Sequence, residues 1–107
     1  MDAREQRMAE NEALFREVNE RVQDAAEHGG GDYDYFCECA NVDCTFRITL
    51  APAEYEAVRQ DPKQFVVLPN HYTPEVEDLA TKYETHWVVR KDGEAGAYVA
   101  KLDPRTR

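Results

Sequence analysis

The sequence predicts an α+β fold, in which a long N-terminal helix precedes a small sheet of about four strands with short helices. Residues 3 to about 27 contain no proline or glycine and are rich in helix-forming side chains. From residue 32 onwards, short apolar runs alternate with turn-forming residues, as in strands and short helices. The three cysteines form a C-x-C-x4-C cluster at positions 37, 39 and 44. This cluster indicates a bound metal ion that cross-links and stabilises this small domain.

The N-terminal helix carries an apolar stripe whose members recur at steps of three and four residues, as in a heptad seam. They are Met8, Asn11, Phe15, Val18, Val22 and Ala25. Two interpretations stay open: the stripe packs on the protein's own sheet, or it binds a partner helix, including that of a second copy. The stripe is shorter than the roughly three to four heptads of an independent coiled coil. Its first five members are the candidate partner-binding residues.

Gly29, Gly30 and Gly31 end this helix and form a joint. The chain therefore divides into residues 1–31, the N-terminal helix and glycine joint, and residues 32–107, a small α+β domain that carries the cysteines. In this second part, residues 32–39 are expected to form a strand that ends in the cysteine knuckle. Residues 45–50 are expected to pair with it as a hairpin whose tip is the cysteine loop.

The remaining elements follow from turn signals and short apolar runs. Pro52 begins a helix that Asp61 and Pro62 end. Residues 73–80 stay open between a short helix through Glu77 and an extended segment. The other elements expected are a helix over 53–60, strands over 65–68 and 85–91, and a helix over 94–102.

The cysteine cluster predicts a zinc site, because three thiolates supply three ligands and a structural site needs a fourth. His71 is the favoured fourth ligand, since it follows the buried strand 65–68 in a Pro-Asn-His loop. The predicted Zn²⁺ ligands are therefore Cys37, Cys39, Cys44 and His71.

Different arrangements of this site stay open. Glu38, Asp43 or water can replace His71 as the fourth ligand. His28, beside the glycines, and His86, beside Trp87 in a strand, are less favoured. Without a metal, the cysteines would be buried or redox-active thiols.

Charge and composition limit the function further. The net charge of −9 opposes binding to a phosphate backbone, so nucleic acid is an unlikely partner. No segment is apolar enough to cross a membrane, and the charged N-terminus lacks a signal-peptide core. We therefore expect a cytoplasmic protein, where clustered cysteines stay reduced and bind metal.

Several segments carry a resemblance to a known family. They are Asn11–Arg21, Phe36–Cys39 with Cys44, Glu54–Arg59, Phe65–Val67, Pro69–His71 and Asp103–Arg105. With them, the chain resembles a family of uncharacterised small proteins from actinobacteria and their relatives. Family members typically have glycine before the histidine, where this chain has Asn70, and both residues tolerate a left-handed backbone. The resemblance supports grouping the three cysteines with His71, and it implies no established activity.

The favoured function is a non-catalytic, zinc-stabilised interaction module that regulates another protein. A Cys3His site leaves no open coordination position, so an enzyme is not expected. One alternative is a thiol-based redox or metal sensor that releases zinc on oxidation. A DNA-binding transcription regulator is a further alternative, which the acidic charge disfavours.

Overall fold

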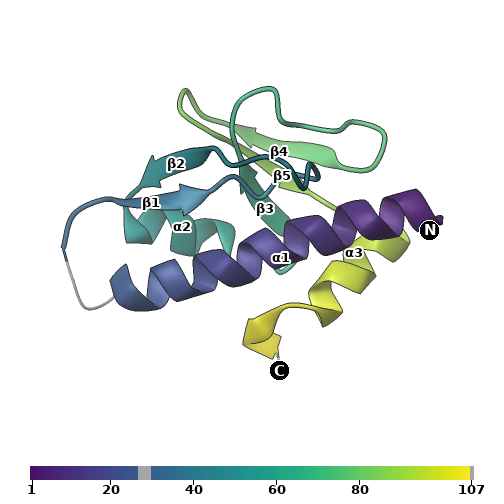
Figure 1. Cartoon of the computed structure of the whole chain (residues 1–107), viewed down its shortest axis with the longest axis horizontal. Helices are drawn as coiled ribbons and strands as arrows, with labels where there is room; N and C mark the ends of the chain where they lie inside the picture. Colours follow the sequence, from purple (N-terminus) through teal and green to yellow (C-terminus); the bar gives the residue numbers. More distant parts are fainter. Residues whose placement is uncertain (27–29, 107) are drawn as a thin grey trace.

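Figure 1 shows the computed structural model of the chain, which describes residues 1–26 and 30–106. The predicted α+β class with a long N-terminal helix is confirmed. The elements are α1 (Ala3–Ala26), β1 (Tyr33–Phe36), β2 (Arg47–Leu50), α2 (Pro52–Val58), β3 (Gln64–Val67), β4 (Asp78–Lys82), β5 (Trp87–Arg90), α3 (Gly93–Lys101) and the 3-10 turn η1 (Pro104–Thr106). The expected helix end near residue 27, His28 and Gly29 lie outside the described residues, as does Arg107.

The strands form two small antiparallel sheets rather than one sheet of about four strands. β1 and β2 make the predicted hairpin, with Tyr33 opposite Leu50. The second sheet has the order β3-β5-β4, so β5 is its central strand. Of the two possibilities for residues 73–80, the extended one holds only from Asp78, where β4 begins, because residues 74–76 form a turn.

The segment that directly follows β1, residues 37–39, connects the two sheets. The backbone amide of Cys37 donates to the Phe46 carbonyl at 3.1 Å, which extends the pairing of β1 with β2. The next amide, of Glu38, donates to the Val66 carbonyl in β3 at 2.8 Å. The backbone amides of successive residues in an extended segment point to opposite edges, so this segment bonds to β2 on one side and to β3 on the other.

Helix α1 spans the molecule, with the sheets on one side and α3 beside its N-terminal half on the other (Figure 1). Its buried face differs from the predicted apolar stripe. The buried residues are Ala9, Glu12, Ala13, Arg16, Asn19, Gln23 and Ala26. The stripe lies beside this face, and Leu14 and Val18 are 55% and 37% exposed. Of the two open interpretations, packing of the stripe on the protein's own core therefore holds only in part, since Val22 packs against the core whereas Val18 is exposed.

The polar side chains of α1 reach backbone groups of other elements. Arg16 donates to the carbonyls of Pro62 at 2.6 Å and Val99 at 2.7 Å. Asn19 donates to the Phe36 carbonyl at 2.8 Å and accepts from the Phe36 amide at 2.7 Å. Buried polar groups are tolerated when they are hydrogen-bonded in this way, so these contacts fix α1 against β1, the turn before β3, and α3.

Beneath α1, the apolar core joins both sheets. The rings of Tyr35 in β1 and Tyr55 in α2 stack at 4.5 Å between centroids. The valines at 66 and 67 in β3 and at 89 in β5 are fully buried beside them. This core holds the strand ends that carry the candidate site. Among the described residues, no helix combines the length and apolar character that a membrane span requires.

Candidate metal centre

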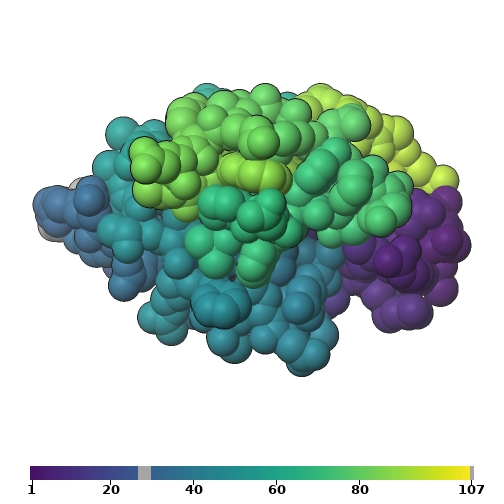
Figure 2. All heavy atoms as spheres, turned by 90° about the horizontal axis from the view of Figure 1, so that it is seen from above, coloured from purple at the N-terminus to yellow at the C-terminus, as the bar shows by residue number. Residues whose placement is uncertain are grey.

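The predicted ligands come together from three segments. Cys37 and Cys39 lie in the segment directly after β1, Cys44 ends the turn that follows, and His71 lies in the loop after β3. Their donor atoms all lie within 4.8 Å of one another. Figure 2 shows the segment around residue 42 in blue-teal beside the green segment around residue 70.

The donor spacing fits a tetrahedral ion. Zinc binds sulfur at about 2.3 Å and imidazole nitrogen at about 2.0–2.1 Å, which places sulfur and nitrogen about 3.6 Å apart in a tetrahedron. The Nδ1 atom of His71 lies 3.5 Å from Sγ of Cys37 and 3.7 Å from Sγ of Cys44. The set of three thiols and one imidazole is also the one that zinc prefers. These four residues could hold a metal ion, and zinc is the plausible occupant.

Backbone groups orient the ligands. The Leu68 amide donates to Sγ of Cys37 at 3.2 Å, and the Phe46 amide bonds to the thiol of Cys44. His71 is turned back by a bond from its amide to the Leu68 carbonyl at 3.0 Å. This turn has a left-handed backbone at Asn70, whose φ is +70°, a conformation that asparagine tolerates better than most residues.

The three thiols differ in acidity. A hydrogen bond from the Cys37 thiol lowers the pKa of Cys39 to about 5, and the same contact raises the pKa of Cys37. Burial raises the pKa of Cys44. One thiolate is therefore available at neutral pH, whereas the other two lose their protons when an ion binds. Metal affinity should accordingly increase with pH.

Glu38, between two of the ligands, is not part of the cluster. Its fully buried carboxylate accepts hydrogen bonds from Asn19 at 2.9 Å, the Tyr55 hydroxyl at 2.7 Å and the Val66 amide at 3.0 Å. Burial raises the pKa of Glu38, and these hydrogen bonds act against that shift. Its role is to tie the cysteine knuckle to α1, α2 and β3.

Asp43 and His86 also lie outside the cluster that the described residues form, so neither is placed to be the fourth ligand. Asp43 is exposed in the turn, where its amide bonds to the side chain of Asn41. His86 is buried near α2 and bonds through Nδ1 to the Thr85 hydroxyl at 3.0 Å.

A hollow of about 260 Å³ borders the site, and Cys39, Asn70 and His71 are among its lining residues. The Phe46 ring lies edge-on to His71 with 5.9 Å between ring centroids, and Phe46 is 62% exposed. One side of the ligand cluster is thus reachable from solvent, although the three cysteines are themselves buried.

Sequence reasoning missed two buried polar groups near α1. Lys91 is fully buried and lies 2.8 Å from Glu12 and 3.7 Å from Glu77. Arg59 is buried as well, and it pairs with Glu20 and Asp103 at 2.5 Å each. The sequence gives no signal for the burial of Lys91 and Arg59, because the acidic partners that make it possible lie far away in the sequence.

A scan against protein-family models, a search of curated proteins and a search of solved structures each found no match. The resemblance to the actinobacterial family therefore stays a prediction.

Proposed function

We propose that the protein is a zinc-stabilised, non-catalytic interaction module that regulates another protein. The observation that carries this proposal is the set of four donors within 4.8 Å of one another, drawn from the β1–β2 hairpin and the loop after β3. A bound ion would connect the two sheets and so contribute directly to folding. Four protein ligands complete a tetrahedral shell, which leaves no position for a reactive water.

The surface beside this scaffold supports a role in binding. On α1, Leu14 and Val18 are exposed, and they lie next to the partly buried Phe15 and Val22. Exposed apolar side chains grouped on one helix face are typical of a contact surface for another helix. We propose that this contact includes Met8, Asn11, Phe15, Val18 and Val22. Leu14, which is exposed beside them, would also contribute.

Elemental analysis of the purified protein tests the metal part of the proposal. We expect one zinc ion per chain in the wild type, and less in His71→Ala. His86→Gln is the matched control, because it removes a histidine outside the cluster and should leave the zinc content unchanged. A wild-type protein without metal, whose circular dichroism is indifferent to a chelator, would contradict the proposal.

The binding part needs a separate experiment. Val18→Asp places a charge in the exposed stripe and should abolish binding of the partner, or self-association measured by sedimentation equilibrium. Asp24→Ala changes an exposed charge on the same helix outside the stripe and serves as control. Unchanged association in Val18→Asp would exclude the stripe as the contact.

A second candidate function is a redox sensor, which the solvent-exposed hollow beside Cys39 and His71 favours. Hydrogen peroxide would accept two electrons from two thiolates and take up two protons, giving a disulfide and two waters, and the zinc ion would leave. Peroxide treatment should then release zinc, and a dithiol should restore binding. Zinc that is retained under peroxide would rule this candidate out.

A further inference from the structure

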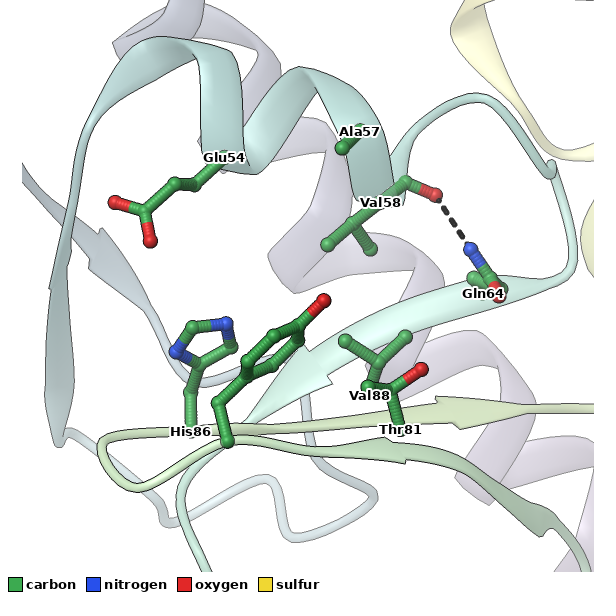
Figure 3. Close-up of a pocket in the computed structure, with 8 residues that line it drawn as sticks. Glu54, Ala57, Val58, Gln64, Thr81, His86 and Val88 are labelled. Atoms are coloured by element: carbon green, nitrogen blue, oxygen red, sulfur yellow. Dashed lines mark hydrogen bonds between the residues drawn. The ribbon is translucent and has the colours of Figure 1, made fainter.

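A second hollow lies between α2 and the β4–β5 hairpin, on a part of the fold that the metal centre does not use (Figure 3). Its volume is about 430 Å³, within the range of roughly 300–1,000 Å³ that is typical of small-ligand sites. The lining residues are Glu54, Ala57, Val58, Gln64, Thr81, Tyr83, His86 and Val88.

His86 supplies a neutral hydrogen-bonding group to this hollow. It is only 4% exposed, and burial lowers the pKa of its imidazole, so the ring is uncharged at neutral pH. Its Nδ1 bonds to the Thr85 hydroxyl at 3.0 Å. Among the described residues, Nε2 has no such partner, and Figure 3 shows the ring facing the space below Glu54. When Nδ1 carries the proton, Nε2 is a free acceptor.

Glu54 supplies a negative charge from the opposite wall. Its Oε1 accepts a hydrogen bond from the Ala51 amide at 2.8 Å, which holds the side chain at the start of α2 and leaves the second oxygen available. In Figure 3 the carboxylate hangs from α2 towards His86. The two walls thus present a carboxylate and a neutral imidazole, both of which accept hydrogen bonds.

The rest of the lining is aromatic and apolar. The Tyr83 ring stacks on His86 with 4.8 Å between centroids, and Tyr83 is 55% exposed. An aromatic face attracts a cation. Val58 and Val88 provide an apolar floor on which a short chain of methylene groups can pack.

We propose that this hollow binds a primary alkylammonium group, with the methylene chain on the valine floor and the ammonium between Glu54, His86 and Tyr83. An ammonium has three donors and no acceptor, so it matches a site that offers a carboxylate, a free imidazole nitrogen and an aromatic face. The group can come from a small amine or from a lysine side chain of another protein. The acidic chain, with a net charge of −9, favours either cation over an anion.

The first test is a titration with n-pentylamine, followed by the backbone amide shifts of residues 81–88 in ¹H–¹⁵N spectra. We expect saturation at millimolar concentration, and no saturation with the neutral n-pentanol or the anionic hexanoate. Nα-acetyl-lysine-N-methylamide distinguishes the source: tighter binding of this probe points to a lysine side chain, and weaker binding to a free amine.

Glu54→Gln should weaken pentylamine binding about tenfold, because it removes the charge while keeping an oxygen for the Ala51 amide. Glu84→Gln removes an exposed charge from the same hairpin outside the hollow and should bind like the wild type. Tyr83→Ala, at an exposed position, is a second variant and should weaken binding several-fold. The proposal is overturned if pentylamine does not saturate these shifts, if pentanol binds equally well, or if Glu54→Gln and Glu84→Gln behave alike.

Discussion

Replacing Glu38 tests whether the knuckle is held by its buried carboxylate or by the metal alone. Glu38→Ala removes the acceptor of three hydrogen bonds, whose donors are Asn19, Tyr55 and the Val66 amide. Glu38→Gln keeps the size of the side chain and one acceptor oxygen, but turns an amide nitrogen towards one of the donors. The two variants therefore separate the loss of hydrogen bonds from the loss of volume.

The magnitude follows from the donors that are left without a partner. A buried unsatisfied donor costs about 1–3 kcal/mol, and breaking a buried charged network costs about 3–5 kcal/mol. Burial desolvates the Glu38 carboxylate and raises its pKa. Removing the carboxylate ends this desolvation cost, which offsets part of the lost stability. We expect a destabilisation of about 3–5 kcal/mol for Glu38→Ala and about 1–3 kcal/mol for Glu38→Gln.

The assay is urea unfolding in saturating zinc, with the metal content measured on the same samples. Because Glu38 lies outside the ligand set, both variants should keep the zinc content of the wild type under native conditions. The reasoning would be refuted if Glu38→Ala unfolded within about 1 kcal/mol of the wild type. A variant that stayed folded but lost zinc would instead make Glu38 a ligand.

Three further predictions concern other elements. Gly96→Ala should destabilise the fold by about 1–3 kcal/mol, because the added Cβ would lie 2.5 Å from the Lys91 carbonyl oxygen. Urea unfolding measures this, and Gly30→Ala, whose Cβ would meet no atom within 4 Å, should leave the stability unchanged. Asn70→Val should weaken zinc binding in a chelator competition, since a β-branched residue resists a φ of +70°, whereas Asn70→Gly should not. Glu12→Gln should become more stable relative to the wild type as pH increases. Burial raises the pKa of Glu12 well above 4.5. The stability that protonated Glu12 contributes to the wild type is therefore fully present below pH 4.5 and is lost as pH rises through the folded-state pKa. The measurement is urea unfolding of both proteins over a range of pH. A difference in free energy of unfolding between Glu12→Gln and the wild type that did not grow with pH would contradict this prediction.

The metal cluster was predictable because its geometry is largely local. Cys37, Cys39 and Cys44 lie on one knuckle, so their spacing already brings three donors together. His71 was recognised from its place after a buried strand, and the left-handed Asn70 explains how the loop turns back to the knuckle. The arrangement of the strands in two sheets that Glu38 and Val66 join was not predictable, because these two residues lie 28 positions apart in the sequence.

The buried face of α1 differs from its apolar stripe for a physical reason. Apolar periodicity identifies the buried face only when burial is driven by apolar area. Here Arg16 and Asn19 are buried because they bond to backbone carbonyls at Pro62, Val99 and Phe36. Those acceptors lie at the ends of other elements, and no pattern within the helix reveals them.

This arrangement has a consequence for the exposed stripe. Hydrogen bonds are directional, so the contacts of Arg16 and Asn19 determine how α1 is rotated about its axis. An apolar interface could accept small rotations, whereas this one loses several buried hydrogen bonds if the helix turns. Leu14 and Val18 therefore cannot rotate inwards without leaving buried donors unpaired. The polar residues on the buried face of α1 thus hold Leu14 and Val18 at the surface, where the proposed partner helix would contact them.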